Sequence, residues 1–123
     1  MNAEVKALWV KALRSGQYVQ GESYLHRVTQ NEGALYCCLG VLCDLAVKAG
    51  VLPPPIQGRN DEQEPVFAYG KDRQKAELPV EVMDWAGITS TDGGYSATNS
   101  LVNDNDSGEV DFSQIADIIE KHF

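Results

Sequence analysis

Hydrophobic residues are densest in one stretch of the chain, from Tyr36 to Gly50, in which only two residues are charged. The apolar residues fall on nearly every side of a helix, which is typical of a helix buried in a core. The stretch is too short and too polar to cross a bilayer, which requires roughly 20 apolar residues. Gly40 near its middle predicts the close approach of another backbone. The pattern therefore predicts a buried central helix at about residues 37–49.

Two amphipathic helices are predicted near the ends of the chain. In the first, apolar residues recur at helical spacing between Asn2, a suitable N-cap, and Gly16, a suitable stop. These apolar positions are Val5, Leu8, Trp9, Ala12 and Leu13. In the last helix, Asp111 and Gln114 have the spacing of a capping box, in which each side chain accepts a hydrogen bond from the other residue's backbone N–H. Both helices are expected to pack their apolar stripes on the central helix.

Short segments with a preference for β-structure lie on either side of the central helix. Residues 18–20 and 24–28 predict a hairpin that leads into the helix, and residues 34–36 are able to pair with its second strand. Residues 66–69 predict another short strand. Residues 53–65, rich in proline and charge, predict a surface loop between the helix and that strand.

The rest of the chain predicts one short helix and one long loop. Leu78 and Pro79 open a helix that ends at Gly87. Residues 88–102 are rich in Thr, Ser, Gly and Asn, have no clear period and predict a loop, and long loops in small domains are often functional. We therefore expect a single α+β domain over residues 1–123, with three to four helices around the central helix and a small antiparallel sheet.

The charge of the chain restricts its partners. The formal net charge is −8, and residues 51–123 carry fourteen acids against five bases. Such a surface repels phosphate backbones, so we expect no general binding to nucleic acid. The N-terminus has no basic segment followed by an apolar run, so neither a secretion signal nor a membrane anchor is expected, and the protein is expected in the cytoplasm.

The three cysteines suggest two interpretations. They are odd in number and lie together in the predicted central helix, which favours reduced, packed thiols over disulfides. A cysteine at the start of a helix is also the arrangement of reactive thiols. The best catalytic triad that the sequence offers has Cys38 as nucleophile, His26 as base, and Asp104 or Asn103 as the orienting group. The same residues could equally be a core thiol and a surface imidazole.

Residues 103–114 resemble an EF-hand calcium loop. Oxygen donors stand at positions 1, 3, 5 and 9 of the loop, in a spacing that suits calcium. These donors are Asn103, Asn105, Ser107 and Asp111. However, position 12 is Gln114, which lacks the bidentate carboxylate of that motif. The alternative is a solvated turn that caps the last helix. No zinc-site spacing or glycine-rich phosphate loop is present, so no cofactor is expected.

A set of segments spread over most of the chain carries a family resemblance. The segments are residues 9–16, 20–21, 36–46, 78–79, 85–87, 103–104 and 115–120, with Leu25 and Phe112, and the cysteine-rich segment 36–46 is the most distinctive. Together they resemble a family of small bacteriophage and prophage proteins with no established activity. The resemblance implies a phage gene product that works in the bacterial cytoplasm.

The resemblance also favours a function in binding, because small phage proteins outside the virion often bind a host component. We expect a non-enzymatic module, with a role against host defence among its functions, that captures a small nucleotide-like ligand or a host protein. The expected ligand-binding residues are Tyr24, Arg27, Tyr36, Asn103 and Asp104, since aromatic rings stack on bases and guanidinium groups bind phosphates. The alternatives are a cysteine-dependent hydrolase that uses Cys38, a calcium-binding protein and a structural component of the virion. A homo-oligomer is compatible with each.

Overall fold

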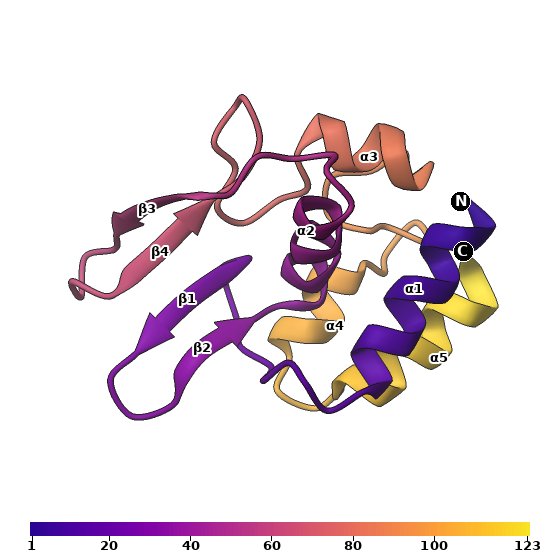
Figure 1. The fold of residues 1–123 in the computed structure, drawn as a ribbon. Helices are drawn as coiled ribbons and strands as arrows, with labels where there is room; N and C mark the ends of the chain where they lie inside the picture. The colour runs from indigo at the N-terminus through magenta and orange to yellow at the C-terminus, as the bar shows by residue number, and fades with distance from the viewer.

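Helix α2 (Cys38–Lys48) lies at the centre of a computed structural model that describes residues 1–123 (Figure 1). It contacts three other helices, and every residue from Cys38 to Cys43 is buried. The other helices are α1 (Ala3–Arg14), α3 (Val80–Ala86), α4 (Leu101–Asp106) and α5 (Phe112–His122). The predicted α+β fold and its buried central helix are therefore confirmed. No helix combines the length and the hydropathy that crossing a bilayer requires.

Helices α1 and α5 run antiparallel and pack against each other (Figure 1). The side chain of Asn2 accepts two backbone N–H hydrogen bonds at the start of α1, as predicted. Asp111 and Gln114 form both hydrogen bonds of the predicted capping box at the start of α5. Arg14 forms ion pairs with Asp117 and Glu120, which join the two helices at their surface.

Helix α1 buries a slightly different stripe from the predicted one. Leu8 is 49% exposed, whereas Val10 is only 8% exposed. The difference arises because α1 packs against α5 as well as α2, and Val10 lies at the edge of the stripe formed by Val5, Trp9 and Leu13. The helix itself and the burial of Trp9 agree with the prediction.

Four short strands form one antiparallel sheet that extends away from the helices (Figure 1). The strands are β1 (His26–Thr29), β2 (Gly33–Tyr36), β3 (Ile56–Arg59) and β4 (Pro65–Ala68). Their order is β2-β1-β4-β3, so two hairpins lie side by side and are joined where Arg27 of β1 pairs with Val66 of β4. The predicted pairing of residues 34–36 with the preceding strand and the predicted strand near residues 66–69 are both confirmed.

Three local predictions are wrong. Residues 18–20 form no strand, and Gln20 makes only one isolated bridge to β2. The predicted loop at residues 53–65 contains β3, whose four residues are all exposed and are ordered by pairing with β4. Residues 101–106, predicted as loop and calcium-binding turn, form α4, because Ser100 caps this helix and Leu101 is fully buried.

Candidate functional site

The structure does not bring Cys38, His26 and Asp104 together as a triad. Cys38 is completely buried, and its Sγ lies 3.7 Å from the carbonyl oxygen of Leu101. Burial raises the pKa of its thiol well above the usual value, so the nucleophilic thiolate is disfavoured. The carboxylate of Asp104 instead accepts a hydrogen bond of 2.5 Å from the hydroxyl of Tyr95. Cys38 and Asp104 thus each contact a residue outside the predicted triad.

His26 is held in an aromatic stack on one face of the sheet. Its ring centroid lies 4.2 Å from that of Tyr36 and 4.2 Å from that of Phe67, in nearly parallel planes. Its Nδ1 lies 3.2 Å from the hydroxyl of Tyr69. Burial lowers the pKa of His26 and raises that of Tyr69, so the uncharged forms of both side chains are favoured. The imidazole is a neutral, packed group.

All three cysteines are free and buried. Cys37 is the N-cap of α2, and its Sγ accepts a hydrogen bond of 3.4 Å from the backbone N–H of Gly40. Burial raises the pKa of Cys37 to about 11, although the hydrogen bond from Gly40 opposes this shift. The helix start that the sequence suggested for a reactive thiol is therefore occupied by a thiol that acts as a cap.

The four residues predicted to bind calcium have separate structural roles. Asn103 is exposed on α4, Ser107 caps the C-terminus of α4, and Asp111 caps α5. The oxygen of Asn105 accepts hydrogen bonds within the protein. Helix α4 therefore occupies the first part of the predicted calcium loop, and the side chain of Asn105 points into the protein. The structure contains no cluster of three or more His, Cys, Asp or Glu side chains arranged to hold a metal ion.

Asn105 connects three parts of the chain and is only 1% exposed. Its Oδ1 accepts hydrogen bonds from the backbone N–H of Cys38, at 3.1 Å, and from Nε2 of Gln20, at 3.0 Å. Its Nδ2 donates to the carbonyl oxygen of Gly21, at 2.8 Å, and to Asp106, at 3.0 Å. This amide therefore holds the segment before β1 and the start of α2 against α4.

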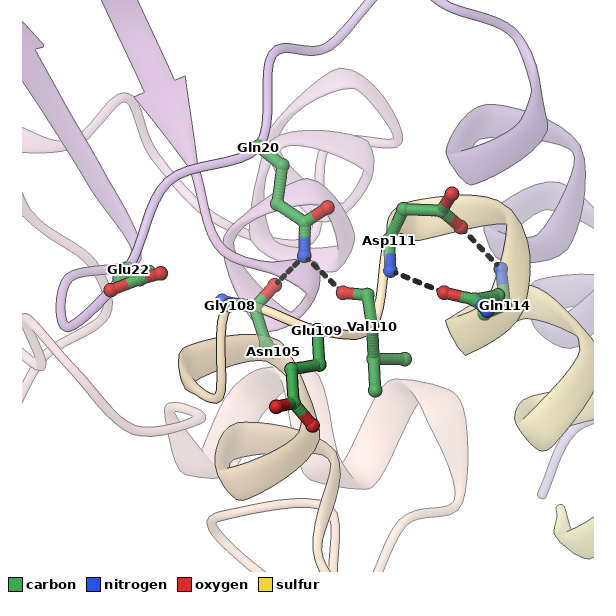
Figure 2. Close-up of a pocket in the computed structure, with 8 residues that line it drawn as sticks. All are labelled: Gln20, Glu22, Asn105, Gly108, Glu109, Val110, Asp111 and Gln114. Atoms are coloured by element: carbon green, nitrogen blue, oxygen red, sulfur yellow. Dashed lines mark hydrogen bonds between the residues drawn. The ribbon is translucent and has the colours of Figure 1, made fainter.

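Asn105 also lines a polar hollow of about 280 Å³ between residues 20–22 and the α4–α5 connection (Figure 2). The lining residues are Gln20, Glu22, Asn105, Gly108, Glu109, Val110, Asp111 and Gln114. Figure 2 shows the amide of Gln20 bonded to Asn105 and to the carbonyl oxygen of Val110. Three carboxylates and no basic side chain line this hollow, so it attracts cations.

A second hollow, of about 300 Å³, shares Glu22 and brings together two of the predicted ligand-binding residues, Tyr24 and Arg27. Its other lining residues are Ser23, Asn60, Asp61 and Glu62. Nη1 of Arg27 lies 3.1 Å from the carboxylate of Glu64, so its charge is paired. Hydrogen bonds from Asn60 and, to a smaller degree, from Arg27 lower the pKa of Glu64.

The other predicted ligand-binding residues lie elsewhere. Tyr36 pairs with His26 on β1, and neighbouring residues of a strand point to opposite faces, so Tyr36 and Arg27 lie on opposite faces of the sheet. Asn103 and Asp104 belong to α4 and line neither hollow. The structure therefore retains Tyr24 and Arg27 from the predicted set and separates the remaining three.

The two hollows form one acidic surface, which we define by the carboxylates of Glu22, Asp61, Glu62, Glu109 and Asp111. Arg27 is the one basic residue that lines it, and its charge is neutralised by Glu64. The acidity of residues 51–123 is evident from the sequence, whereas the part of Glu22, which joins the hollows from the other part of the chain, is not. No local motif marks Glu22, because only folding brings residues 22, 62 and 109 together.

The amino-acid sequence matches one family of known proteins. A family model with the description "Domain of unknown function (DUF8296)" matches residues 1–123. Neither a curated protein nor a solved structure matches the chain.

Proposed function

The chain belongs along its whole length to the DUF8296 family, a domain of unknown function, and we propose that it is a non-enzymatic binding module. Its partner in this proposal is a host protein that presents a segment rich in Lys and Arg. The resemblance of the cysteine-rich segment to phage proteins supports a phage accessory protein acting in the bacterial cytoplasm.

The acidic surface carries this proposal. Five carboxylates surround two adjoining hollows, and the guanidinium of Arg27 is already paired with Glu64. Carboxylates form strong hydrogen bonds with ammonium and guanidinium groups, and complementary charge speeds the encounter of two proteins. A basic partner segment would therefore meet acceptors in both hollows, with Glu22 between them.

The same surface argues against a phosphorylated ligand. Tyr24 offers a ring for stacking on a base, but Glu22, Asp61 and Glu62 line the same hollow and repel phosphate. Nη1 of Arg27 already bonds to Glu64, whose carboxylate would repel a phosphate bound to the same guanidinium. The charges therefore favour a host protein over a nucleotide-like ligand as the partner.

The burial of the thiols supports binding rather than hydrolysis. A hydrolase nucleophile has to reach its substrate, whereas the Cys38 side chain is completely buried behind α4. The imidazole of His26 is stacked between two rings, and Asp104 bonds to Tyr95. No pair of these groups is arranged for proton transfer.

Binding of a fluorescent peptide of about ten lysines tests the proposal. The double variant Glu22→Gln/Glu62→Gln removes one carboxylate from the junction of the hollows and one from the second hollow. Asp72→Asn/Asp84→Asn is the matched control, since both residues are exposed and lie outside the acidic surface, and the two substitutions remove the same two negative charges. Each lost contact is worth about 0.2–1 kcal/mol, so the loss of two should weaken binding by about 2- to 30-fold. The control should change it less than twofold.

Equal weakening by both double variants would show that the peptide responds only to net charge, and would overturn the assignment of this surface. Affinity that does not fall as salt is raised from about 50 to 300 mM would also count against it, since exposed ion pairs are screened by salt.

A further inference from the structure

A third hollow, of about 420 Å³, lies where Met1 and the end of α5 meet the chain that follows α3. It is lined by Met1, Gly87, Ile88, Thr89, Ser90, Gly94, Tyr95, His122 and Phe123. In contrast to the acidic surface, no carboxylate or ammonium side chain lines it. We propose that this hollow binds a flat, uncharged heteroaromatic ring of the size of a nucleobase.

Aromatic side chains form one wall of the hollow. The ring centroid of Tyr95 lies 4.8 Å from that of His122 and 6.2 Å from that of Phe123. The hydroxyl of Tyr95 donates to Asp104 at 2.5 Å, which fixes the position of the ring. Phe123 in turn meets the buried ring of Trp9 edge-on at 6.4 Å. Rings held in this way offer π-faces and edges to another planar ring at little cost in conformational entropy.

The apolar side of the hollow is fixed by backbone contacts. The N–H of Asn2 donates to the carbonyl oxygen of Ala86 at 2.8 Å and ties the start of α1 to the end of α3. Gly87 ends α3 with a φ of 70°, and a Cβ atom at this position would lie 3.1 Å from the nitrogen of Asn2. Met1 and Ile88 are thereby held side by side as the apolar lining.

Ser90 supplies a hydrogen-bond donor. Its Oγ accepts a hydrogen bond of 2.8 Å from the N–H of Gly94, so its hydroxyl proton is free to bond a ring nitrogen or a carbonyl oxygen of a ligand. The hollow thus combines aromatic and aliphatic side chains with polar groups, and its volume lies in the range of about 300–1,000 Å³ that is usual for small-molecule sites.

Charge selects among the molecules that carry such a ring. The net charge of −8 disfavours a phosphate, and the lining offers no guanidinium or ammonium side chain to bind one. A free base or a nucleoside therefore fits this hollow better than a nucleotide. The inference is independent of the proposed binding of a basic segment, because no residue of this hollow belongs to the acidic surface.

Titration with adenosine, followed by amide chemical shifts in the full chain, tests the inference. We expect saturable shifts at Gly87, Gly94 and Tyr95, with a dissociation constant below about 1 mM. Thr89→Trp places a large ring on the exposed rim and should weaken binding at least tenfold. Thr98→Trp is the matched control, because Thr98 is exposed and lies outside the hollow. This control should change the affinity less than twofold.

Ser90→Ala is a second test variant, and this substitution adds no bulk to the hollow. Gly94 keeps its other hydrogen bond, to Asp92 at 3.0 Å, so the loop should hold and only the affinity should fall, by about three- to tenfold. Lack of saturation at 10 mM adenosine would overturn the inference. So would equal effects of the two tryptophan variants, tighter binding of adenosine monophosphate than of adenosine, or equally tight binding of cyclohexanol, which is not flat.

Discussion

The carbonyl oxygen of Leu25 lies only 1.7 Å from the position that a Cβ atom on Gly40 would occupy. The backbone that leads into β1 therefore crosses α2 in direct contact, as the glycine in the middle of the helix predicted. The same carbonyl accepts a hydrogen bond of 3.3 Å from the N–H of Cys37, the N-cap of the helix. This crossing sets the position of the sheet relative to the core.

Gly40→Ala should destabilise the protein by at least about 3 kcal/mol, because the added methyl group meets backbone that cannot move aside alone. Gly40→Leu should be worse. Urea unfolding measures the loss. Gly58→Ala is the control, since a Cβ atom on Gly58 would have its nearest neighbour at 3.9 Å. An unchanged midpoint for Gly40→Ala would contradict the observed crossing.

Asn105→Ala should lower the free energy of unfolding by about 2–6 kcal/mol. The substitution leaves the N–H of Cys38 and the carbonyl oxygen of Gly21 without partners in a buried place, and each orphaned group costs about 1–3 kcal/mol. Asn103→Ala, two residues earlier on the exposed side of α4, should change stability by less than about 0.5 kcal/mol. Thermal unfolding of the two variants side by side gives the comparison, and similar losses would refute the role of Asn105.

The native thiols should be unreactive. With its pKa raised to about 11, Cys37 carries thiolate in only about one molecule in a thousand at pH 8, and burial raises the pKa values of Cys38 and Cys43 as well. An aromatic disulfide reagent should therefore find no fast thiol in the native protein and three in denaturant. One rapidly labelled thiol in the native protein would revive a cysteine-dependent reaction.

The unfolding free energy should fall as the pH drops below about 6.5, in part because of His26. Burial lowers the pKa of this imidazole in the folded state, so the unfolded chain takes up the proton first and is favoured by acid. The stability that neutral His26 contributes is fully present above the pKa that its imidazole has in the unfolded chain. It is lost as the pH falls toward the lower pKa of the imidazole in the folded protein. Urea unfolding at pH 7.5 and 5.5 measures the effect.

His26→Phe should reduce this pH dependence while keeping a ring between Tyr36 and Phe67. His122→Phe is the control, since His122 is exposed and is the only other histidine. A smaller pH dependence in the His122 variant than in the His26 variant would contradict the assignment to the stacked imidazole.

The elements that sequence analysis predicted correctly are those with local causes. The caps at Asn2 and Asp111 depend on residues two or three positions away, and the central helix depends on its own apolar run. Helix α4 was missed because Asn and Asp favour turns over helices. It forms because Leu101 is buried and Asn105 bonds to residues far away in the sequence.

The candidate sites were harder to predict for the same reason. Glu22, Glu62 and Glu109 come from three separate loops, and the hollow beside Tyr95 combines both ends of the chain with the segment after α3. Arg27 and Tyr24 line one hollow, and both belong to one short segment. The ion pair of Arg27 with Glu64 had no signature in the local sequence.

Strand β3 gives the molecule a region of low local stability. All four residues of β3 are exposed, and β3 is joined to the rest of the sheet only through β4. Detaching β3 from β4 would expose little apolar surface, whereas exposing α2 requires the whole core to unfold. Amide hydrogens of β3 should therefore exchange with solvent long before those of α2, so the protein has a slowly exchanging helical body and an edge strand that opens on its own.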